Sequence, residues 1–303
     1  MGFPRIAIVG SNGLLGQNLA RVLASESTSQ IICAGQRERS SAPADQTEYV
    51  QLDITDRTAV KDFALRYYPG VIINCAGMND VDGCETQRER AWKTNVKGVE
   101  NLIGGCRATD ARFIHFSSDY VFDGTHPPYN ERDKPAPLSY YGRTKLASEN
   151  ACRMGGIRFA IIRTAALYGA AINTRENFVQ CVVRVLSSGK AFRAATDQTS
   201  NPTPVDQLAA AVTRVIERGC EGLYHVAGPD IVSRYGFARE IVRVFDLDEN
   251  FLIPVPTAEL NQKALRPVNA GLITLKAESE LGVRLSGIAE GLRLLKRRID
   301  LIP

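Results

Sequence analysis

Two residues four positions apart in "SYYGRTK", Tyr141 and Lys145, could carry out acid catalysis together. On a helix, this spacing places both side chains on one face, where their polar ends can share a site. An ammonium group beside a phenol stabilises the phenolate and lowers the pKa of the phenol, which makes it a general acid near neutral pH. Such a pair can protonate a ketone oxygen while a hydride reaches the carbon. Because the spacing is common by chance, the prediction depends on what surrounds the pair.

A second polar group, "SSDYVFDG" at residues 117–124, follows directly after the apolar run "RFIHF". A hydroxyl at the end of a buried strand can donate a hydrogen bond to a substrate oxygen as negative charge develops there. The stretch offers the two serine hydroxyls, Ser117 and Ser118, for this role. Tyr120 has no lysine one turn away to make it acidic, so we expect it to line the pocket wall. The final "FDG" is an ordinary turn signal.

The stretch "GSNGLLG" follows the first predicted strand and contains three glycines. A tight strand-to-helix turn uses Gly where φ is positive, and the missing side chains let backbone amides approach a pyrophosphate. Glycines also serve tight packing, but their position between a strand and a helix favours a dinucleotide site. The predicted residues of this turn are Gly10, Asn12, Gly13, Leu14, Leu15 and Gly16.

The second predicted strand is followed by "GQRERS", which contains Arg37 and Arg39. An NAD site usually has a carboxylate here for the ribose 2′-OH, whereas a 2′-phosphate favours arginine. The sequence therefore favours NADP(H), the alternative being that both arginines are solvated loop charges.

Two further strand ends are expected to face the same cofactor. "LDITD" supplies Asp53 and Ile54, which could accept the adenine. The nicotinamide half could lie against "NCAG", which supplies Cys75, Ala76 and Gly77.

To lie close together, these groups need a fold in which several strands end at the same edge of a sheet. The first half of the chain has the sequence pattern of such a fold. Short apolar runs alternate with amphipathic segments of helical length, which is typical of βαβ units in a parallel sheet covered on both faces. The predicted strands are 5–10, 30–35, 70–77, 112–118 and 159–165, and the predicted helices are 14–26, 58–68, 88–109 and 141–152. The fold class is therefore α/β, with a doubly wound parallel sheet of the Rossmann type.

From about residue 166 the pattern loosens, which suits a smaller C-terminal α/β substrate-binding cap. We expect a dinucleotide-binding domain at 1–165, with 204–228 returning to it, and the cap at 166–203 and 229–303. The active site is expected in the cleft between them.

The composition, with 44% hydrophobic and 23% charged residues among 303, is that of an ordinary globular protein. A net charge of +4 spread along the chain fits a small anionic ligand and indicates no nucleic-acid partner. Seven cysteines without a CxxC pair favour free thiols in a reducing compartment, and no cluster has metal-ligand spacing. Without a signal peptide or a long apolar stretch, we expect a cytoplasmic protein that does not associate with membranes. His115 and His225 lie within apolar strands and are expected to be core groups.

Taken in order, "GSNGLLG", "INCAG", "SSDYVFDG", "YGRTK" and "RTAALYG" resemble the motifs of the extended short-chain dehydrogenase/reductases. "NFVQ", "DQTSNPTPVDQLA", "GLYHVAG" and "RPVNAGL" resemble cap-side motifs of the dTDP-4-dehydrorhamnose reductase family within that group. The resemblance implies NADPH-dependent reduction of the 4-keto group of a nucleotide-diphosphate deoxysugar, with dTDP-4-dehydro-L-rhamnose as the expected substrate. It leaves a homodimer open, and some relatives use a magnesium ion at a subunit contact.

By position, the resemblance implies a triad of Ser118, Tyr141 and Lys145. Lys145 would also hold the nicotinamide ribose hydroxyls. The family pattern places Asp119 and Tyr120 beside the sugar.

On the cap side, the family pattern places Asn177 near the substrate. Arg266 could bind the diphosphate through two guanidinium nitrogens, the alternative being a loop-anchoring role. Ala166 stands where the family commonly has Trp, so an apolar contact with the sugar is absent and a different deoxysugar could fill the space.

Other functions remain open. The regulatory beta subunit of methionine adenosyltransferase shares this fold, the NADP site and many of these motifs, and it binds a partner instead of reducing a sugar. A non-catalytic subunit has less reason to keep the whole triad, which favours a reductase. Epimerase and 4,6-dehydratase relatives are further alternatives, but a dehydratase would be expected to have an acid pair where "SSDY" offers only Asp119.

Overall fold

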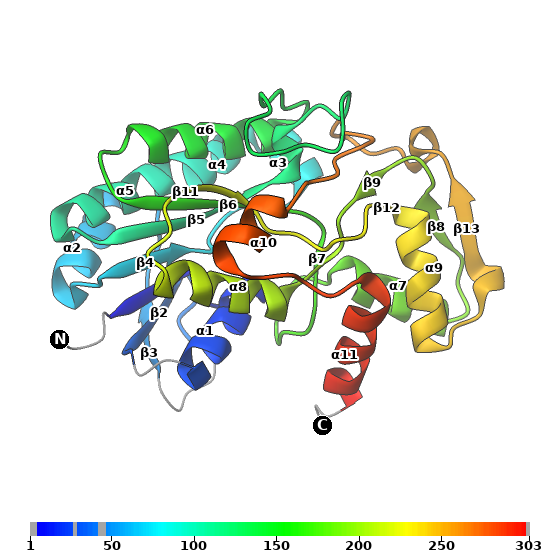
Figure 1. Ribbon diagram of the computed structural model, residues 1–303, viewed down its shortest axis with the longest axis horizontal. Helices are drawn as coiled ribbons and strands as arrows, with labels where there is room; N and C mark the ends of the chain where they lie inside the picture. Colours follow the sequence, from blue (N-terminus) through cyan, green and yellow to red (C-terminus); the bar gives the residue numbers. More distant parts are fainter. Residues whose placement is uncertain (1–4, 27–28, 42–46, 301–303) are drawn as a thin grey trace.

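The structure, a computed structural model, describes residues 5–26, 29–41 and 47–300. At its centre lies a seven-stranded sheet in the order β11-β6-β5-β4-β1-β2-β3 (Figure 1). The strands are β1 (Ile6–Val9), β2 (Ile31–Gly35), β3 (Thr47–Gln51), β4 (Val71–Asn74), β5 (Arg112–Ser118), β6 (Phe159–Thr164) and β11 (Gly222–His225). All neighbouring strands pair in parallel, and the chain order reverses between β1 and β4. The predicted doubly wound Rossmann sheet is confirmed.

Helices cover both faces of this sheet, because alternate residues of each strand are apolar on opposite sides. Ile8 and Ile73 face one layer of helices, while Ala7 and Ile72 face the other. The first layer consists of α1 (Leu14–Glu26), α8 (Val205–Glu217) and α10 (Leu275–Leu281). The second consists of α2 (Arg57–Tyr67), α5 (Gly98–Thr109) and α6 (Tyr140–Met154). The chain enters α5 through α3 (Val81–Thr86), α4 (Arg88–Trp92) and a π-helical turn (Lys93–Lys97).

The cap has a core of its own, seen at the right of Figure 1. Val182, Phe237, Ile241 and Leu292 pack together there from three different helices. Its helices are α7 (Phe178–Ser187), α9 (Arg234–Phe245) and α11 (Ile288–Asp300). Its short strands are β7 (Leu167–Tyr168), β8 (Phe192–Ala195), β9 (Thr199–Ser200), β10 (Thr203–Pro204), β12 (Val232–Ser233) and β13 (Leu252–Val255), paired β7 with β10, β9 with β12 and β8 with β13. Most of this core comes from the three helices, and Ala194 of β8 and Leu252 of β13 add to it.

The course of the chain bears on the predicted domain boundaries. Both α8 and β11, within 204–228, pack with the central sheet. So does α10, which lies inside the segment 229–303 that the sequence assigned to the cap. The boundaries remain a prediction, and the packing of α10 indicates that the chain returns to the sheet a second time.

Candidate active site

The glycine-rich turn packs against the end of β4. Gly10 has a φ of +82°, and a Cβ at this position would lie 2.4 Å from the Ala76 backbone nitrogen. A Cβ at Gly16 would lie 2.4 Å from the Gly10 carbonyl oxygen. Gly13 is exposed, and a Cβ there would meet only the Gly10 oxygen at 3.4 Å. Gly10 and Gly16 are thus required by packing, while Gly13 leaves the N-terminus of α1 open to a pyrophosphate.

Asn12 fixes the loop that carries the two predicted cofactor arginines. Its Nδ2 donates to the Arg39 carbonyl oxygen at 3.2 Å, and its Oδ1 accepts from the Ser41 amide at 2.7 Å. The Tyr49 hydroxyl donates to the Arg37 carbonyl oxygen at 2.5 Å. The Arg37 side chain also donates to the Asn173 carbonyl oxygen in the cap, at 2.9 Å. Both arginines are exposed beside the glycine-rich turn, a placement that fits a 2′-phosphate.

The other predicted strand ends lie along the same edge. The Asp53 carboxylate accepts from the Thr55 amide at 2.8 Å and from Gln36 at 3.1 Å. Ile54 is buried, and a Cβ on Gly98 would lie 2.5 Å from its Cδ1. These contacts fix the strand end that was predicted to accept the adenine.

The predicted nicotinamide segment, Cys75–Gly77, lies beside the catalytic helix. A Cβ built on Gly77 would be 3.9 Å from the Lys145 ammonium nitrogen. Ala76 donates its amide to Asn74 Oδ1 at 3.0 Å, which fixes the turn after β4. Burial raises the pKa of the Cys75 thiol, so this group stays protonated. The segment therefore lies beside Lys145, and its contact with the nicotinamide remains a prediction.

Tyr141 and Lys145 both lie in α6, which is capped by the Ser139 side chain. Both are buried, and the Lys145 nitrogen is 6.0 Å from the centre of the Tyr141 ring. Lys145 donates to the Phe116 carbonyl oxygen in β5 at 2.8 Å. Ser118 ends the same strand, so the structure brings the three predicted catalytic residues together.

The electrostatics of this pair correct one expectation from the sequence. Burial raises the pKa of Tyr141, the Asp119 carboxylate adds to the rise, and hydrogen bonding from Ser118 opposes it. Burial also lowers the pKa of Lys145 to about 8. The lowered pKa that the sequence led us to expect for Tyr141 is not found in this structure, because burial outweighs the groups that favour the phenolate. The Lys145 ammonium group itself donates to the Phe116 carbonyl.

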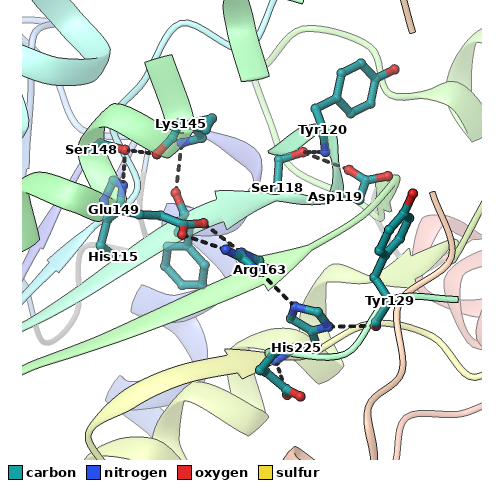
Figure 2. Close-up of polar contacts among 12 residues, drawn as sticks. His115, Ser118, Asp119, Tyr120, Tyr129, Lys145, Ser148, Glu149, Arg163 and His225 are labelled. Carbon is teal, nitrogen blue, oxygen red and sulfur yellow. Dashed lines mark hydrogen bonds and ion pairs between the residues drawn. The ribbon is translucent and has the colours of Figure 1, made fainter. Parts of the chain in front are cut away.

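A chain of buried hydrogen bonds leads from Asn74 through His115 and Ser148 to the backbone carbonyl of Lys145; its last three residues are labelled in Figure 2. His115 Nδ1 accepts from the Asn74 amide nitrogen at 3.2 Å, so its Nε2 donates to Ser148 Oγ at 2.8 Å. Ser148 in turn donates to the Lys145 carbonyl oxygen at 2.7 Å. Burial lowers the pKa of His115 to about 3, which keeps it neutral and agrees with its expected core role.

Figure 2 also shows a buried ion pair that sequence reasoning missed. Arg163 donates from two nitrogens to the two Glu149 oxygens, each at 2.8 Å, and the side chains are 1% and 0% exposed. His225 Nε2 accepts from Arg163 at 3.4 Å, and its Nδ1 donates to the Tyr129 carbonyl oxygen at 3.2 Å. An arginine inside the apolar run "FAIIRTA" was the one available signal.

Asp119 and Tyr120 form the short 3-10 turn that follows β5. Ser118 Oγ lies 2.7 Å from Asp119 Oδ1, and the Tyr120 amide donates to Ser118 Oγ at 3.2 Å. The Tyr120 ring meets the Tyr141 ring edge-on, with centroids 5.7 Å apart. Both residues thus lie beside the triad, as expected for residues that contact the sugar.

The two predicted cap-side residues, Asn177 and Arg266, form hydrogen bonds with other residues of the protein. The Asn177 side chain caps α7, accepting from the Gln180 amide at 3.3 Å and donating to the Gly169 carbonyl oxygen at 2.7 Å. Arg266 donates to both oxygens of Asp82, at 3.0 and 2.9 Å. Their substrate contacts remain predictions, and Arg266 would have to exchange Asp82 for a diphosphate.

Ala166 has a φ of +44°, a left-handed conformation that non-glycine residues rarely adopt. It is half-buried, and its carbonyl oxygen accepts from the Thr203 amide at 3.2 Å. The position is therefore fixed by the β7–β10 region, with a methyl group where the family commonly has an indole.

Within 5–26, 29–41 and 47–300, no group of three His, Cys, Asp or Glu residues is arranged to hold a metal ion. None of the helices described there is both long and apolar enough to cross a membrane.

A doubly wound parallel sheet, a glycine-rich first turn and a Tyr–Lys helix beside a strand-end serine define an extended short-chain dehydrogenase/reductase. Residues 4–299 match the family described as RmlD substrate binding domain. The chain belongs to this family, which confirms the resemblance found in its motifs.

Curated relatives cover nearly the whole chain. The probable low-salt glycan biosynthesis reductase Agl14 of Haloferax volcanii is 33% identical over 95% of this chain and 96% of its own length. The methionine adenosyltransferase 2 subunit beta of Pongo abelii is 32% identical over 92% of this chain and 83% of its own.

Solved structures of dTDP-4-dehydrorhamnose reductases have the same fold over nearly the whole chain. A dTDP-4-dehydrorhamnose reductase of Clostridium acetobutylicum has a TM-score of 0.86 at 31% identity, covering 98% of this chain and 100% of that one. The corresponding reductase of Bacillus anthracis, solved in complex with NADP, has a TM-score of 0.85 at 27% identity over 98% and 100% of the two chains.

Proposed function

We propose that this protein is an NADPH-dependent reductase of the 4-keto group of a nucleotide-diphosphate deoxysugar, with dTDP-4-dehydro-L-rhamnose as the first substrate to test. The observation that carries the proposal is the meeting of two strand ends with helix α6. Gly77, after β4, lies beside the Lys145 ammonium group, which donates to the Phe116 carbonyl of β5. Ser118 ends β5 next to Tyr141, one turn before Lys145 on the same helix. A solved relative with the same fold binds NADP.

Each residue of the site then has a distinct role in the reduction of the ketone. NADPH supplies the hydride when it is bound. The Tyr141 hydroxyl gives its proton to the C4 oxygen, so that a ketone gains one hydride and one proton and becomes an alcohol. Lys145, held against the Phe116 carbonyl, provides positive charge near the phenolate that Tyr141 becomes. Arg266 exchanges the Asp82 carboxylate for the substrate diphosphate.

The experiment is to follow NADPH absorbance after adding each of a panel of 4-keto nucleotide sugars, and to determine the product configuration by NMR. We expect NADPH oxidation with a dTDP-linked 4-keto sugar, and slower turnover when NADH replaces NADPH at the same concentration. Failure to oxidise NADPH with every sugar of the panel would overturn the proposal.

A second candidate function has one observation in its favour, the 32% identity to a methionine adenosyltransferase 2 subunit beta. On this alternative, the chain binds NADP and a partner enzyme without reducing a sugar. Mixing the protein with a methionine adenosyltransferase catalytic subunit in gel filtration tests it. We expect separate elution, and co-elution without NADPH oxidation would favour the alternative.

A further inference from the structure

The hydrogen bonds of Ser118 conflict with its expected role. Its Oγ lies 2.7 Å from Asp119 Oδ1, accepts from the Tyr120 amide at 3.2 Å and is also a hydrogen-bond neighbour of the Tyr141 hydroxyl, which can donate to it. An ionised carboxylate only accepts hydrogen bonds, and a serine hydroxyl has a single proton. While Asp119 is ionised, Ser118 must give that proton to Asp119. No proton is then left to donate to a substrate carbonyl oxygen.

Protonation of Asp119 removes the conflict. A neutral carboxyl can donate its own proton to Ser118 Oγ, which frees the Ser118 proton to point at the substrate oxygen. No proton leaves either group in this arrangement. The proton that the product gains still comes from Tyr141, and only the direction of the Ser118 hydrogen bond changes.

The surroundings of Asp119 make the neutral form accessible. The residue is 3% exposed, and burial raises the pKa of its carboxyl to about 6. Hydrogen bonding from Ser118 and the positive charge of Arg234, at the start of α9, both oppose this rise.

The other ionisable groups near Asp119 are two phenols, a thiol and two arginines. The neighbouring phenols are Tyr120 and Tyr141, whose pKa values burial raises. Arg234 and Arg266 lower the pKa of Tyr120. The Cys84 thiol, whose pKa is raised to about 11 by burial, packs with Tyr141. Below the pKa of Asp119 its carboxyl is therefore neutral, and above it the carboxyl is ionised.

We propose that Asp119 is a positioning residue that acts through Ser118: only its protonated form turns the Ser118 hydroxyl toward the C4 oxygen of the sugar. This proposal rests on the proposed ketone reduction. It gives Asp119 a role other than the sugar contact that the family pattern implies. It also predicts that kcat falls as the pH rises through the pKa of Asp119, because the hydrogen bond from Ser118 to the sugar is then lost.

The variant Asp119→Asn separates these roles. An amide has an N–H that can donate to Ser118 Oγ, as a protonated carboxyl can, and it carries no charge. The positive charge of Arg234 acts on this position and attracts the amide oxygen, which leaves the N–H for Ser118. The variant therefore imitates protonated Asp119 at every pH.

The test is the pH dependence of kcat for NADPH-dependent reduction by the wild type, Asp119→Asn and a control, Asp62→Asn. Asp62 is an exposed carboxylate on α2, away from the site. We expect the wild type and the control to lose about tenfold in kcat per pH unit above the pKa of Asp119. Asp119→Asn should lose activity only where Lys145, with its pKa of about 8, becomes neutral.

Two results would overturn the assignment. Asp119→Asn could retain the wild-type descending limb, which would place that limb on another group. It could instead raise KM for the sugar at all pH values with the profile unchanged, which would make Asp119 a substrate contact. Absence of wild-type NADPH oxidation at every pH is a different result, which overturns the proposed function itself and this role of Ser118 with it.

Discussion

The sheet domain and the contact between the cap and α3 hold their charged side chains in different ways. In the sheet domain, the Glu149–Arg163 pair is 0% and 1% exposed and belongs to a buried layer of hydrogen bonds. At the cap, Arg266, which is 12% exposed, pairs with Asp82, which is 36% exposed, and Arg175 pairs with Asp80 at the surface. Breaking a buried pair costs several kcal/mol, whereas an exposed pair contributes about 1 kcal/mol or less. The Glu149–Arg163 pair is therefore fixed by its burial, and we predict that Arg266 can exchange its half-exposed partner Asp82 for a ligand.

The largest effect should come from the sheet domain, at Lys145. Replacing Lys145 with Met keeps the length of the buried side chain but removes its charge and its bond to the Phe116 carbonyl. We expect kcat to fall by about 10²–10⁴, with a normal circular dichroism spectrum. Steady-state kinetics with NADPH measures this, and a kcat close to that of the wild type would remove Lys145 from the chemistry.

Breaking the buried pair should affect stability. We expect Glu149→Gln to lower the free energy of unfolding by about 3–5 kcal/mol, because Arg163 is left buried without its carboxylate. The matched control is Glu240→Gln, which removes half of the exposed pair with Arg243 and should cost about 1 kcal/mol or less. Urea unfolding measures both variants. Equal losses would show that burial does not distinguish the two pairs.

A change at Arg266 should alter substrate affinity and leave the chemistry intact. Lysine cannot form the two-nitrogen contact of arginine, so Arg266→Lys should raise KM for the nucleotide sugar about tenfold with kcat within about twofold. Arg193→Lys, in an exposed cap pair with Glu259, is the control. An unchanged KM would mean that Arg266 only anchors its loop to Asp82.

The smallest effect is expected at Asn177. Its side chain caps α7, and loss of such a cap costs about 1 kcal/mol. We expect Asn177→Ala to lower the free energy of unfolding by about that amount, with KM for the sugar unchanged. A raised KM with unchanged stability would instead support the sugar contact implied by the family pattern.

The sequence predicted what depends on local pattern. Gly10, Ser118 and the Tyr141–Lys145 pair were placed by strand ends and by helical spacing, and the structure brings them together. These features need only the order of elements, because parallel strands end at one edge.

Other features depend on contacts between distant parts of the chain. Arg266 and Asp82 are 184 positions apart, and their pairing follows from how the cap meets α3. The direction of the Lys145 ammonium group was equally out of reach, because it depends on a carbonyl of β5 that packs behind α6. Motif spacing alone therefore placed the pair on one face of a helix, and it missed the burial that raises the pKa of Tyr141.

The most direct test of the account is a kinetic comparison of the wild type with Tyr141→Phe, in which only a hydroxyl is lost. NADPH binding, followed by fluorescence titration, should keep its dissociation constant within about twofold, because the glycine-rich turn is unchanged. Reduction of the 4-keto sugar should slow by about 10²–10⁴ in kcat. Turnover by Tyr141→Phe at the wild-type rate would contradict the central claim that Tyr141 supplies the proton.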